Sequence, residues 1–562
     1  MTKCRRHLLS LLVALVCSAA LACTPSESAD ITLINGNIYT LNPDQPKAEA
    51  IAIQGDRILY VGRSVAVKSY ETPWTERIDL EGRTVVPGLT DSHVHLSGVG
   101  FRELTLNLEG ATSLNEMIER VRTEAADIPM GEWVTGRGWI EAQWDPPVFP
   151  TRHDLDRAAP DHPLWLTRAD GHGAVANSKA LEIAGVSRTT KDPSGGEVMR
   201  DARGEPTGML LDRAKNLVDQ HIPDPSDERE HEALVVGARF LMERGWTEVS
   251  IAGSSFDEVE RIRRLQDEGD IKIRIYDNLR GPGADADRLL EQGAVQREHG
   301  GLFTLRGIKV VADGALGSQG AALMEDYADR TGKGLLLWTE DELRPLYERA
   351  LREGIQIQTH AIGDRANRMI LDLYEEAFEK VPAAERKVAD PRWRIEHAQV
   401  VHPDDIPRFA ALKVIPSMQA SHAITDFHFA RSRLGEERLK GAYAWKSMLN
   451  AGAIIAGGSD APVEQGDPMI EFYAAVARKD LNGFSDEYWH PEEVLTREEA
   501  LKALTLWPAY ASFEEDVRGT IETGKWADLT VLSQDIMTVE AAAIPKTQNE
   551  MTIVAGKVVY RK

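Results

Sequence analysis

Eight short apolar segments alternate with helical stretches over most of the chain, and this alternation limits the possible folds more than any other feature. The stretches 260–269 and 343–354 have the apolar spacing of amphipathic helices and end at glycine. Apolar strands that alternate with helices indicate a parallel sheet, and eight such units predict an α/β fold of the (β/α)8 TIM-like barrel type. The eight predicted strands are 84–96, 245–253, 272–278, 307–314, 354–364, 392–399, 413–419 and 453–463.

The two ends of the chain show a different pattern. Residues 31–84 and 515–562 contain alternating apolar residues around turn signals such as Asn-Gly and Gly-Asp, which is typical of β-hairpins. We expect both ends to form one composite β-sandwich beside a barrel at 85–514. The stretch at about 105–240 is too long for a simple strand-to-helix connection, so it is predicted to be a subdomain inserted after the first barrel strand.

The first 22 residues have the composition of a secretory signal peptide. A basic start precedes an apolar run at 8–22, which is shorter than the roughly 20 residues of a membrane span, and small residues follow. All three cysteines of the chain lie within its first 23 residues. The remainder therefore forms no disulfide and no thiolate metal site.

The run "AALAC", which ends at Cys23, resembles the lipobox of bacterial lipoproteins, and residues 23–30 resemble the polar tether that follows one. The resemblance implies cleavage before Cys23 and lipid attachment to its thiol. The alternative is a plain signal peptide that is cut at Ala22. We expect an exported protein that is anchored by lipid to a bacterial membrane, on the periplasmic or cell-surface side.

The charge of the chain excludes one class of partner. The formal net charge of the 562 residues is −24, whereas binding to nucleic acid requires clustered Lys and Arg. The apolar share of 42% is that of a globular protein. We therefore expect a soluble catalytic or binding body that does not bind nucleic acid, whose only membrane contact is the N-terminal lipid.

Two histidines close the first predicted strand, in "GLTDSHVHL". Side chains at i and i+2 of a strand point to the same face, so His93 and His95 can aim two imidazoles at one point. Neutral imidazole is a common metal ligand. A pair of ordinary histidines near a loop is the alternative, and a single His-x-His pattern does not decide between the two.

Three further polar residues follow apolar strands at their expected carboxyl ends. These are His360 after "IQIQT", His397 after "RIE" and Asp460 after "IIAGGS". Any one of them alone is better explained as a capping or solvated residue. Because active sites of such barrels lie at the carboxyl ends of the strands, the five residues together predict a convergent site.

Lys309 lies inside the apolar strand "GIKVVADG". A buried ammonium is costly unless it is paired or its pKa falls. One interpretation is a salt bridge to Asp313. The other is a carboxylated lysine, whose carbamate is an anion that can bridge two metal ions.

The order of these motifs resembles the amidohydrolase superfamily of metal-dependent hydrolases, and most of all the branch that includes N-substituted formamide deformylases. The resemblance covers nearly all of the chain after its signal segment. The stretches that carry it are "VVPGLTDSHVHL", "RADGHGAVANSKAL", "GEPTGMLLD", "GIKVVADGALGS", "THAIGDRA", "RIEHAQ", "GGSDAPV", "GTIETGKWADLTVL" and "IVAGKVVY".

The resemblance implies one or two divalent metal ions, usually Zn²⁺, bound by His93, His95, His360 and His397. It implies that Asp460 binds metal and moves the proton, and that Lys309 is carboxylated. Metal-bound hydroxide would attack an amide or formamide carbonyl, and Asp460 would deliver the proton to the leaving nitrogen. The expected reaction is hydrolysis of a non-peptide carbon–nitrogen bond in a small molecule.

Residues of the insertion are candidates for substrate binding. "RADGH" places Arg168, Asp170 and His172 in a segment that the resemblance brings near the barrel mouth, with a structural turn as the alternative. Trp139 and Trp144 can line an apolar pocket, although aromatic residues are more often part of a core. Gln419 and His422, after the seventh strand, also belong to the candidate set.

Other functions remain open at this stage. The same ligands serve deamination, lactone opening and deacylation of N-acyl amino acids, because fold and metal do not determine the substrate. A lipid-anchored binding protein without catalysis is a rival of another class. Dimers are common among similar proteins, so a homodimer is compatible with the resemblance.

Overall fold

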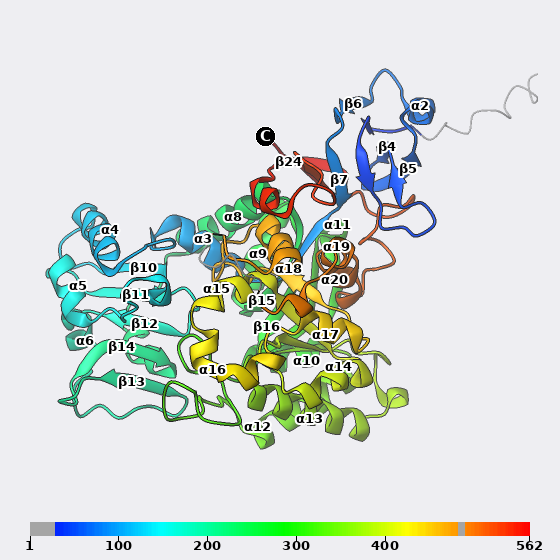
Figure 1. The fold of residues 1–562 in the computed structure, drawn as a ribbon. Helices are drawn as coiled ribbons and strands as arrows, with labels where there is room; N and C mark the ends of the chain where they lie inside the picture. Colours follow the sequence, from blue (N-terminus) through cyan, green and yellow to red (C-terminus); the bar gives the residue numbers. More distant parts are fainter. Residues whose placement is uncertain (1–27, 482–488) are drawn as a thin grey trace, which may run out of the picture.

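The fold is a nearly closed barrel of eight parallel strands that carries a second domain and an insertion (Figure 1). The computed structural model describes residues 28–481 and 489–562. Each barrel strand overlaps one of the eight predicted segments, so the predicted fold class is confirmed. The strands are β8 (Leu89–Val94), β15 (Trp246–Ser254), β16 (Arg274–Arg280), β18 (Phe303–Val311), β19 (Gln356–Ala361), β20 (Arg394–His397), β21 (Ile415–Gln419) and β22 (Ala456–Gly458).

A buried carboxylate joins the last strand to the first. Asp91 in β8 accepts hydrogen bonds from the backbone N–H of Ser459 at 2.8 Å and from its hydroxyl at 2.5 Å. A side chain at Gly458 would place its Cβ 2.7 Å from Asp91 Oδ1, so only glycine fits at this position. The backbone N–H of Asp460 donates to His93 O at 2.7 Å, which brings two predicted site residues together.

Amphipathic helices cover the outside of the barrel. In α9 (Phe256–Glu268) the buried residues recur every three or four positions, and the helix ends at Gly269 in the left-handed region. In the same way α12 (Glu340–Glu353) ends at Gly354. Other main helices are α3 (Leu96–Leu104), α8 (Asp227–Arg244), α10 (Ala284–Gln292), α13 (Asp364–Lys380), α14 (Ile406–Leu412), α17 (Trp445–Asn450), α18 (Pro468–Ala477), α19 (Arg497–Ala503) and α20 (Leu506–Ala511).

The insertion after β8 forms a six-stranded sheet with its own core, at the left of Figure 1. Its first helix is α4 (Leu114–Asp127), which begins at the N-cap Ser113. Its strands are β9 (Leu106–Asn107), β10 (Val134–Trp139), β11 (Leu164–Arg168), β12 (Gly173–Ala176), β13 (Gly196–Arg200) and β14 (Pro206–Asp212).

The insertion ends earlier than the predicted limit of about residue 240. Its last strand, β14, finishes at Asp212, and α8 packs closely on α3 of the barrel layer. A Cβ on Gly100 would lie 1.7 Å from Ala233 O, so the two helices touch backbone to backbone. Helical periodicity shows that α8 is amphipathic but not which element covers its apolar face.

Both ends of the chain build a β-sandwich, at the upper right of Figure 1. One sheet has the order β5-β4-β1-β6 and the other β25-β24-β23-β7-β2-β3, so the second sheet mixes strands from both termini. The strands are β1 (Ile31–Ile34), β2 (Asn37–Tyr39), β3 (Lys47–Ala48), β4 (Ala50–Gln54), β5 (Arg57–Gly62), β6 (Glu76–Asp79), β7 (Thr84–Pro87), β23 (Leu529–Leu532), β24 (Asn549–Val554) and β25 (Lys557–Arg561).

The sandwich begins slightly before the predicted tether ends. Ala29 is buried and its N–H donates to Tyr70 O at 2.9 Å, so the end of the predicted tether 23–30 already belongs to the sandwich. The predicted signal peptide 1–22 and Cys23 lie outside the described residues. A buried ion pair fixes the sandwich to the barrel, because Arg274 holds Asp528 with Nε–Oδ2 2.7 Å and Nη2–Oδ1 3.0 Å.

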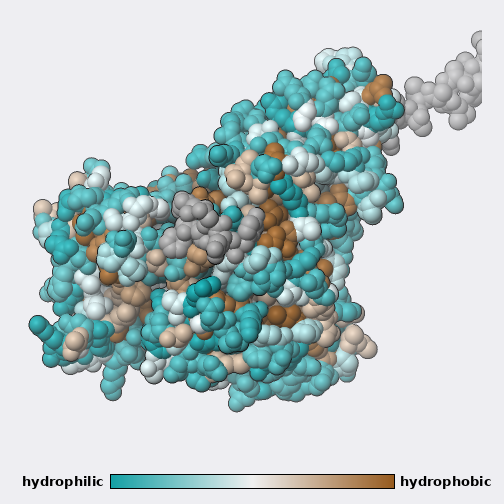
Figure 2. Space-filling view, in the orientation of Figure 1, coloured by the Kyte–Doolittle hydropathy of each residue, from teal (hydrophilic) through white to brown (hydrophobic). Residues whose placement is uncertain are grey.

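The face of the molecule in Figure 2 is mostly hydrophilic, with apolar residues in scattered groups. Across residues 28–481 and 489–562, no helix combines the length and the apolar character that a membrane crossing requires.

Candidate active site

A cavity of about 410 Å³ lies at the carboxyl ends of the barrel strands. Its wall comes partly from the barrel and partly from the insertion, which is the usual position of an active site in such barrels. All six residues that the sequence analysis selected as metal-site residues line it: His93, His95, Lys309, His360, His397 and Asp460.

His93 is held in one orientation from behind. Its Nδ1 donates to Glu396 Oε2 at 2.5 Å, and Arg394 in turn pairs with Glu396 at 2.8 Å. A carboxylate at Nδ1 keeps the proton there, so the Nε2 lone pair is free for a ligand. Nε2 lies 3.2 Å from Lys309 Nζ and 3.5 Å from Asp460 Oδ1.

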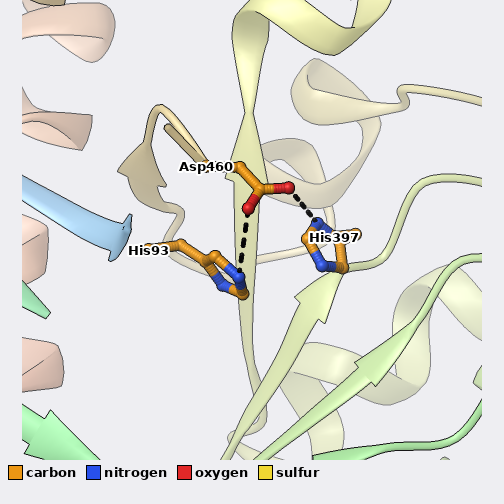
Figure 3. Close-up of side chains that lie close together, drawn as sticks. All are labelled: His93, His397 and Asp460. Atoms are coloured by element: carbon orange, nitrogen blue, oxygen red, sulfur yellow. Dashed lines mark ion pairs between the residues drawn. The ribbon is translucent and has the colours of Figure 1, made fainter. Parts of the chain in front are cut away.

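Asp460 lies between the imidazole rings, and Figure 3 shows its carboxylate flanked by His93 and His397. Its Oδ1 is 3.2 Å from His95 Nε2, and its Oδ2 is 3.9 Å from His397 Nδ1. Burial favours the neutral acid, but the adjacent imidazoles of His93, His422 and His95 prevail and hold the pKa of Asp460 well below its usual value. Asp460 is therefore ionised at neutral pH.

The backbone at these two residues is strained. Asp460 has φ +57° and His397 has φ +73°, a region that residues with a Cβ rarely adopt. Such strain of about 1–3 kcal/mol per residue persists only where the surrounding structure enforces it, and it concentrates at functional sites.

The donor set fits a divalent metal ion. One ligand atom each from His93, His397 and Asp460 lie within 4.8 Å of one another. Asp460 Oδ1 and His360 Nε2 are buried and have no hydrogen-bond partner in the described structure, although buried polar atoms are normally satisfied. Imidazole and carboxylate donors suit zinc and other divalent ions.

Lys309 is buried in the barrel wall next to His93. The salt bridge to Asp313, one of its two interpretations, is not formed: Asp313 accepts backbone hydrogen bonds from Ala322, Ile362 and Gly363 at 2.8–2.9 Å. Within the described residues no carboxylate lies within 4.0 Å of Nζ. Burial lowers the pKa of Lys309 to about 8.

The insertion contributes Arg168, Asp170 and His172 to the cavity wall. Arg168 is fully engaged, with Nε–Glu141 Oε2 at 2.8 Å and Nη1–Asp170 Oδ2 at 2.5 Å. His172 Nδ1 donates to Asp212 Oδ1 at 2.7 Å. Burial lowers the pKa of His172, but its hydrogen bond to Asp212 outweighs burial and the net shift is upward.

The remaining substrate candidates have different positions. Trp139 and Trp144 do not line the cavity: they pack in the core of the insertion, where their indole N–H groups donate to Leu166 O and Ala111 O. The pocket interpretation of both tryptophans is therefore wrong, because the insertion has a core of its own.

Gln419 and His422 lie beside the metal-site residues. Gln419 Oε1 accepts from His397 Nδ1 at 2.8 Å, so this residue orients a histidine rather than lining the cavity. His422 does line the cavity, with Nε2 3.5 Å from Asp460 Oδ2. Burial opposes its charged form, but the adjacent carboxylate of Asp460 raises the pKa of His422 to about 9.

Several site residues were absent from the sequence-based set. Glu396 lies directly before His397, and a buried carboxylate inside an apolar strand was a usable signal. Asp91, two residues before His93, shares its strand face by the same alternation. Asp212 ends the quoted stretch "GEPTGMLLD", which was a usable signal, whereas Arg137 has a partner that is distant in sequence and no local pattern points to it.

A parallel barrel whose strand ends carry histidines and an ionised aspartate defines a metal-dependent hydrolase. The profile of the amidohydrolase family matches residues 76–560, and the chain belongs to that family. As a member it is a hydrolase of carbon–nitrogen bonds other than peptide bonds.

Two curated relatives and a solved structure match over nearly their full length. The chain is 34% identical to the putative amidohydrolase YtcJ of Bacillus subtilis (strain 168), over 94% of this chain and 98% of that protein. It is 30% identical to the N-substituted formamide deformylase of Arthrobacter pascens, over 96% and 99%. A metal-dependent hydrolase from Pyrococcus horikoshii OT3 superimposes with a TM-score of 0.72 at 28% identity, over 91% and 99%.

Proposed function

We propose that the protein hydrolyses the carbon–nitrogen bond of a small amide or formamide, with Zn²⁺ as its metal and Asp460 as the proton shuttle. The observation that carries the proposal is the ionised Asp460 carboxylate, which lies within 4.0 Å of four imidazoles and has one oxygen without a hydrogen-bond partner in the described structure. A base next to the histidine cluster, in the cavity at the strand ends, supports this assignment.

The residues that would hold the metal are His93, His95, His360 and His397, together with Asp460. When bound, a divalent ion acidifies water and polarises a carbonyl oxygen. Glu396 keeps the His93 proton on Nδ1, and Gln419 orients His397.

Asp460 then performs the proton transfers. Because its pKa is low, it is a carboxylate at neutral pH and accepts a proton from the attacking water. It returns that proton to the leaving nitrogen, so the amine departs neutral. The cationic His422, 3.5 Å from Oδ2, favours the ionised form of Asp460 between turnovers.

The similarity to the Arthrobacter pascens N-substituted formamide deformylase supports a formamide or amide over other substrates. Deamination and lactone opening use the same donors and are the alternatives, whereas deacylation of an N-acyl amino acid is one case of amide hydrolysis. A panel of N-substituted formamides, amides, cyclic ureas and lactones separates them by rate.

The test is the Asp460→Asn variant of the zinc-loaded protein. We expect kcat to fall by about 10²–10⁴-fold, the usual contribution of a positioned acid–base group. Metal content should change far less, because the histidines remain. Glu258→Gln, which removes a carboxylate from the same cavity wall, is the matched control and should leave kcat near wild type. Full turnover by Asp460→Asn would contradict the assigned role.

We further propose that Lys309 is carboxylated. Its amine reacts with CO₂ to form a carbamate and one proton, and a pKa of about 8 leaves more neutral amine than an exposed lysine has. Two metal ions per chain that depend on added bicarbonate would support this. One ion per chain, indifferent to bicarbonate, would make Lys309 an ordinary lysine.

Export and lipid attachment at Cys23 are proposals from the sequence. Mass spectrometry of the mature N-terminus tests both, since an unmodified Cys23 there would contradict the lipid anchor. The oligomeric state, proposed as a homodimer, is measured by light scattering of residues 24–562.

A further inference from the structure

Arg137 lines the active-site cavity from the insertion side without a carboxylate partner. It lies on β10, and its Nη2 donates to Ala169 O at 2.8 Å. Its Nε is buried and has no hydrogen-bond partner in the described structure. No carboxylate of the described residues lies within 4.0 Å of the guanidinium, although Asp460, Asp170 and Glu109 are near enough to act on it electrostatically. Glu109 is itself paired with Arg102, whose Nη1 lies 3.5 Å from its Oε2.

The neighbouring arginine of the cavity differs in this respect. Arg168 has both Glu141 and Asp170 in direct contact, so its charge is compensated. Burial and the charge of Arg102 disfavour the cationic form of Arg137 and lower its pKa to about 10, which leaves the group charged at neutral pH. A cation without a counter-ion in a largely buried site costs free energy of desolvation, and an anionic ligand would offset that cost.

The acidic groups of the cavity do not supply the missing charge. Asp170 forms an ion pair with Arg168, and Asp460 contacts the metal-site histidines. Burial raises the pKa of Glu464 to about 8, so Glu464 is mainly neutral at pH 7. Asp426 accepts hydrogen bonds from Gln399 and from the Tyr443 hydroxyl, and it does not lie within 4.0 Å of the Arg137 guanidinium. Glu258 lines the cavity from α9, and it does not lie within 4.0 Å of the Arg137 guanidinium.

From this arrangement we infer that Arg137 binds a carboxylate of the substrate, which makes the substrate an amide that carries a carboxylate, such as an N-acylated amino acid. A guanidinium presents paired N–H donors that match a carboxylate. Arg280 lines the same cavity without a carboxylate within 4.0 Å, but it is exposed to solvent and its Nε donates to Gly253 O at 2.7 Å, whereas Arg137 is partly buried and its Nε has no partner in the described structure. The inference rests on the proposed amide hydrolysis and adds the substrate class to it.

The same cavity then binds both ends of the substrate. The scissile amide lies at the histidine cluster of the barrel, and the carboxylate lies at β10 of the insertion. Apolar residues of the wall, Ile140, Leu316 and Phe429, remain for the group between the two. A neutral amide would leave the charge of Arg137 uncompensated in the complex, so it should bind less tightly.

The experiment compares matched substrates on the zinc-loaded protein. N-formyl- and N-acetyl-phenylalanine, in both enantiomers, are assayed beside the corresponding carboxamides, which lack only the negative charge. We expect kcat/KM to be at least about 10-fold higher for a carboxylate than for its carboxamide. Arg137→Gln should remove most of that preference by raising KM, and leave the carboxamide within about twofold.

Two further variants separate binding from a structural effect. Arg137→Lys keeps the charge without the paired donors and should retain part of the preference. Arg157→Gln removes an exposed arginine of the same insertion and should change neither substrate. If Arg137→Gln slows both substrates equally, or if wild type prefers the carboxamide, the inference is wrong.

A binding measurement separates failure of this inference from failure of the proposed function. Calorimetry with N-acetyl-phenylalanine and its carboxamide needs no turnover. Suppose that neither compound is hydrolysed, but that the carboxylate binds wild type at least about 10-fold more tightly than it binds Arg137→Gln. This result would support the anion site and contradict the proposed amide hydrolysis. Equal binding of the carboxylate to wild type and Arg137→Gln would overturn the anion site.

Discussion

Replacing Glu396 by glutamine should weaken metal binding although Glu396 is not a ligand. Its carboxylate accepts the Nδ1 proton of His93 at 2.5 Å and is fully buried. Burial favours its neutral form, but Arg394 prevails and lowers the pKa of Glu396 to about 2. The group is therefore a fixed negative charge behind a ligand, and it makes Nε2 of His93 a stronger donor.

The size of the effect follows from two contributions. Loss of such a partner typically costs about 10–100-fold in metal affinity or activity, or about 1.4–2.7 kcal/mol. In addition, Arg394 loses its buried counter-ion, a change that costs about 3–5 kcal/mol of stability when nothing replaces it. We expect less here, because Arg394 Nη2 keeps Ser92 O at 2.5 Å and Ser417 Oγ at 2.7 Å.

The assay measures the two contributions separately. Competition with a chelator gives the metal Kd, and chemical denaturation of the metal-free protein gives the free energy of unfolding. The double variant Glu396→Gln/Arg394→Met removes the pair together and should recover stability but not metal affinity. A Glu396→Gln protein with an unchanged metal Kd would refute the reasoning, whatever its stability.

Two further predictions concern stability. Gly100→Ala should destabilise the protein by about 1–3 kcal/mol, because the new Cβ would meet Ala233 O and force α3 and α8 apart. Urea unfolding measures this loss of stability, and an unchanged midpoint would contradict the close contact. Burial raises the pKa of Asp277 to about 8, so its contribution to stability is present below about pH 4 and is lost as pH rises through 8. Asp277→Asn should therefore flatten the decline of the unfolding free energy between about pH 4 and 8, and parallel curves for the two proteins would contradict this.

The barrel and its histidine cluster could be predicted because their signals are local. His360, His397 and Asp460 each follow an apolar run, and parallel topology brings the ends of all such runs to one edge. The side chains need no distant information to arrive there. The cavity therefore contains every predicted metal-site residue, whereas their ligand roles stay predictions until metal content is measured.

Predictions that depended on a partner were less secure. The proposed pairing of Lys309 with Asp313 used proximity in sequence, but Asp313 is taken by backbone N–H groups of Ala322, Ile362 and Gly363. The tryptophans of the insertion were predicted to line the pocket because the residue type alone does not distinguish an apolar pocket from a hydrophobic core. In both cases the competing contact lies on another segment of the chain.

The same reasoning explains why Arg168 was selected and Arg137 was not. A motif identifies which residues reach the cavity. Binding of a charged substrate requires, in addition, a charged side chain that has no counter-ion in the protein, and this depends on contacts with distant segments of the chain. Glu141, 27 residues away, compensates the charge of Arg168. The fold supplies no such partner to Arg137. The barrel strands thus bring the metal-site residues together locally, whereas the proposed selection of a carboxylate substrate depends on the charge of Arg137 in the insertion.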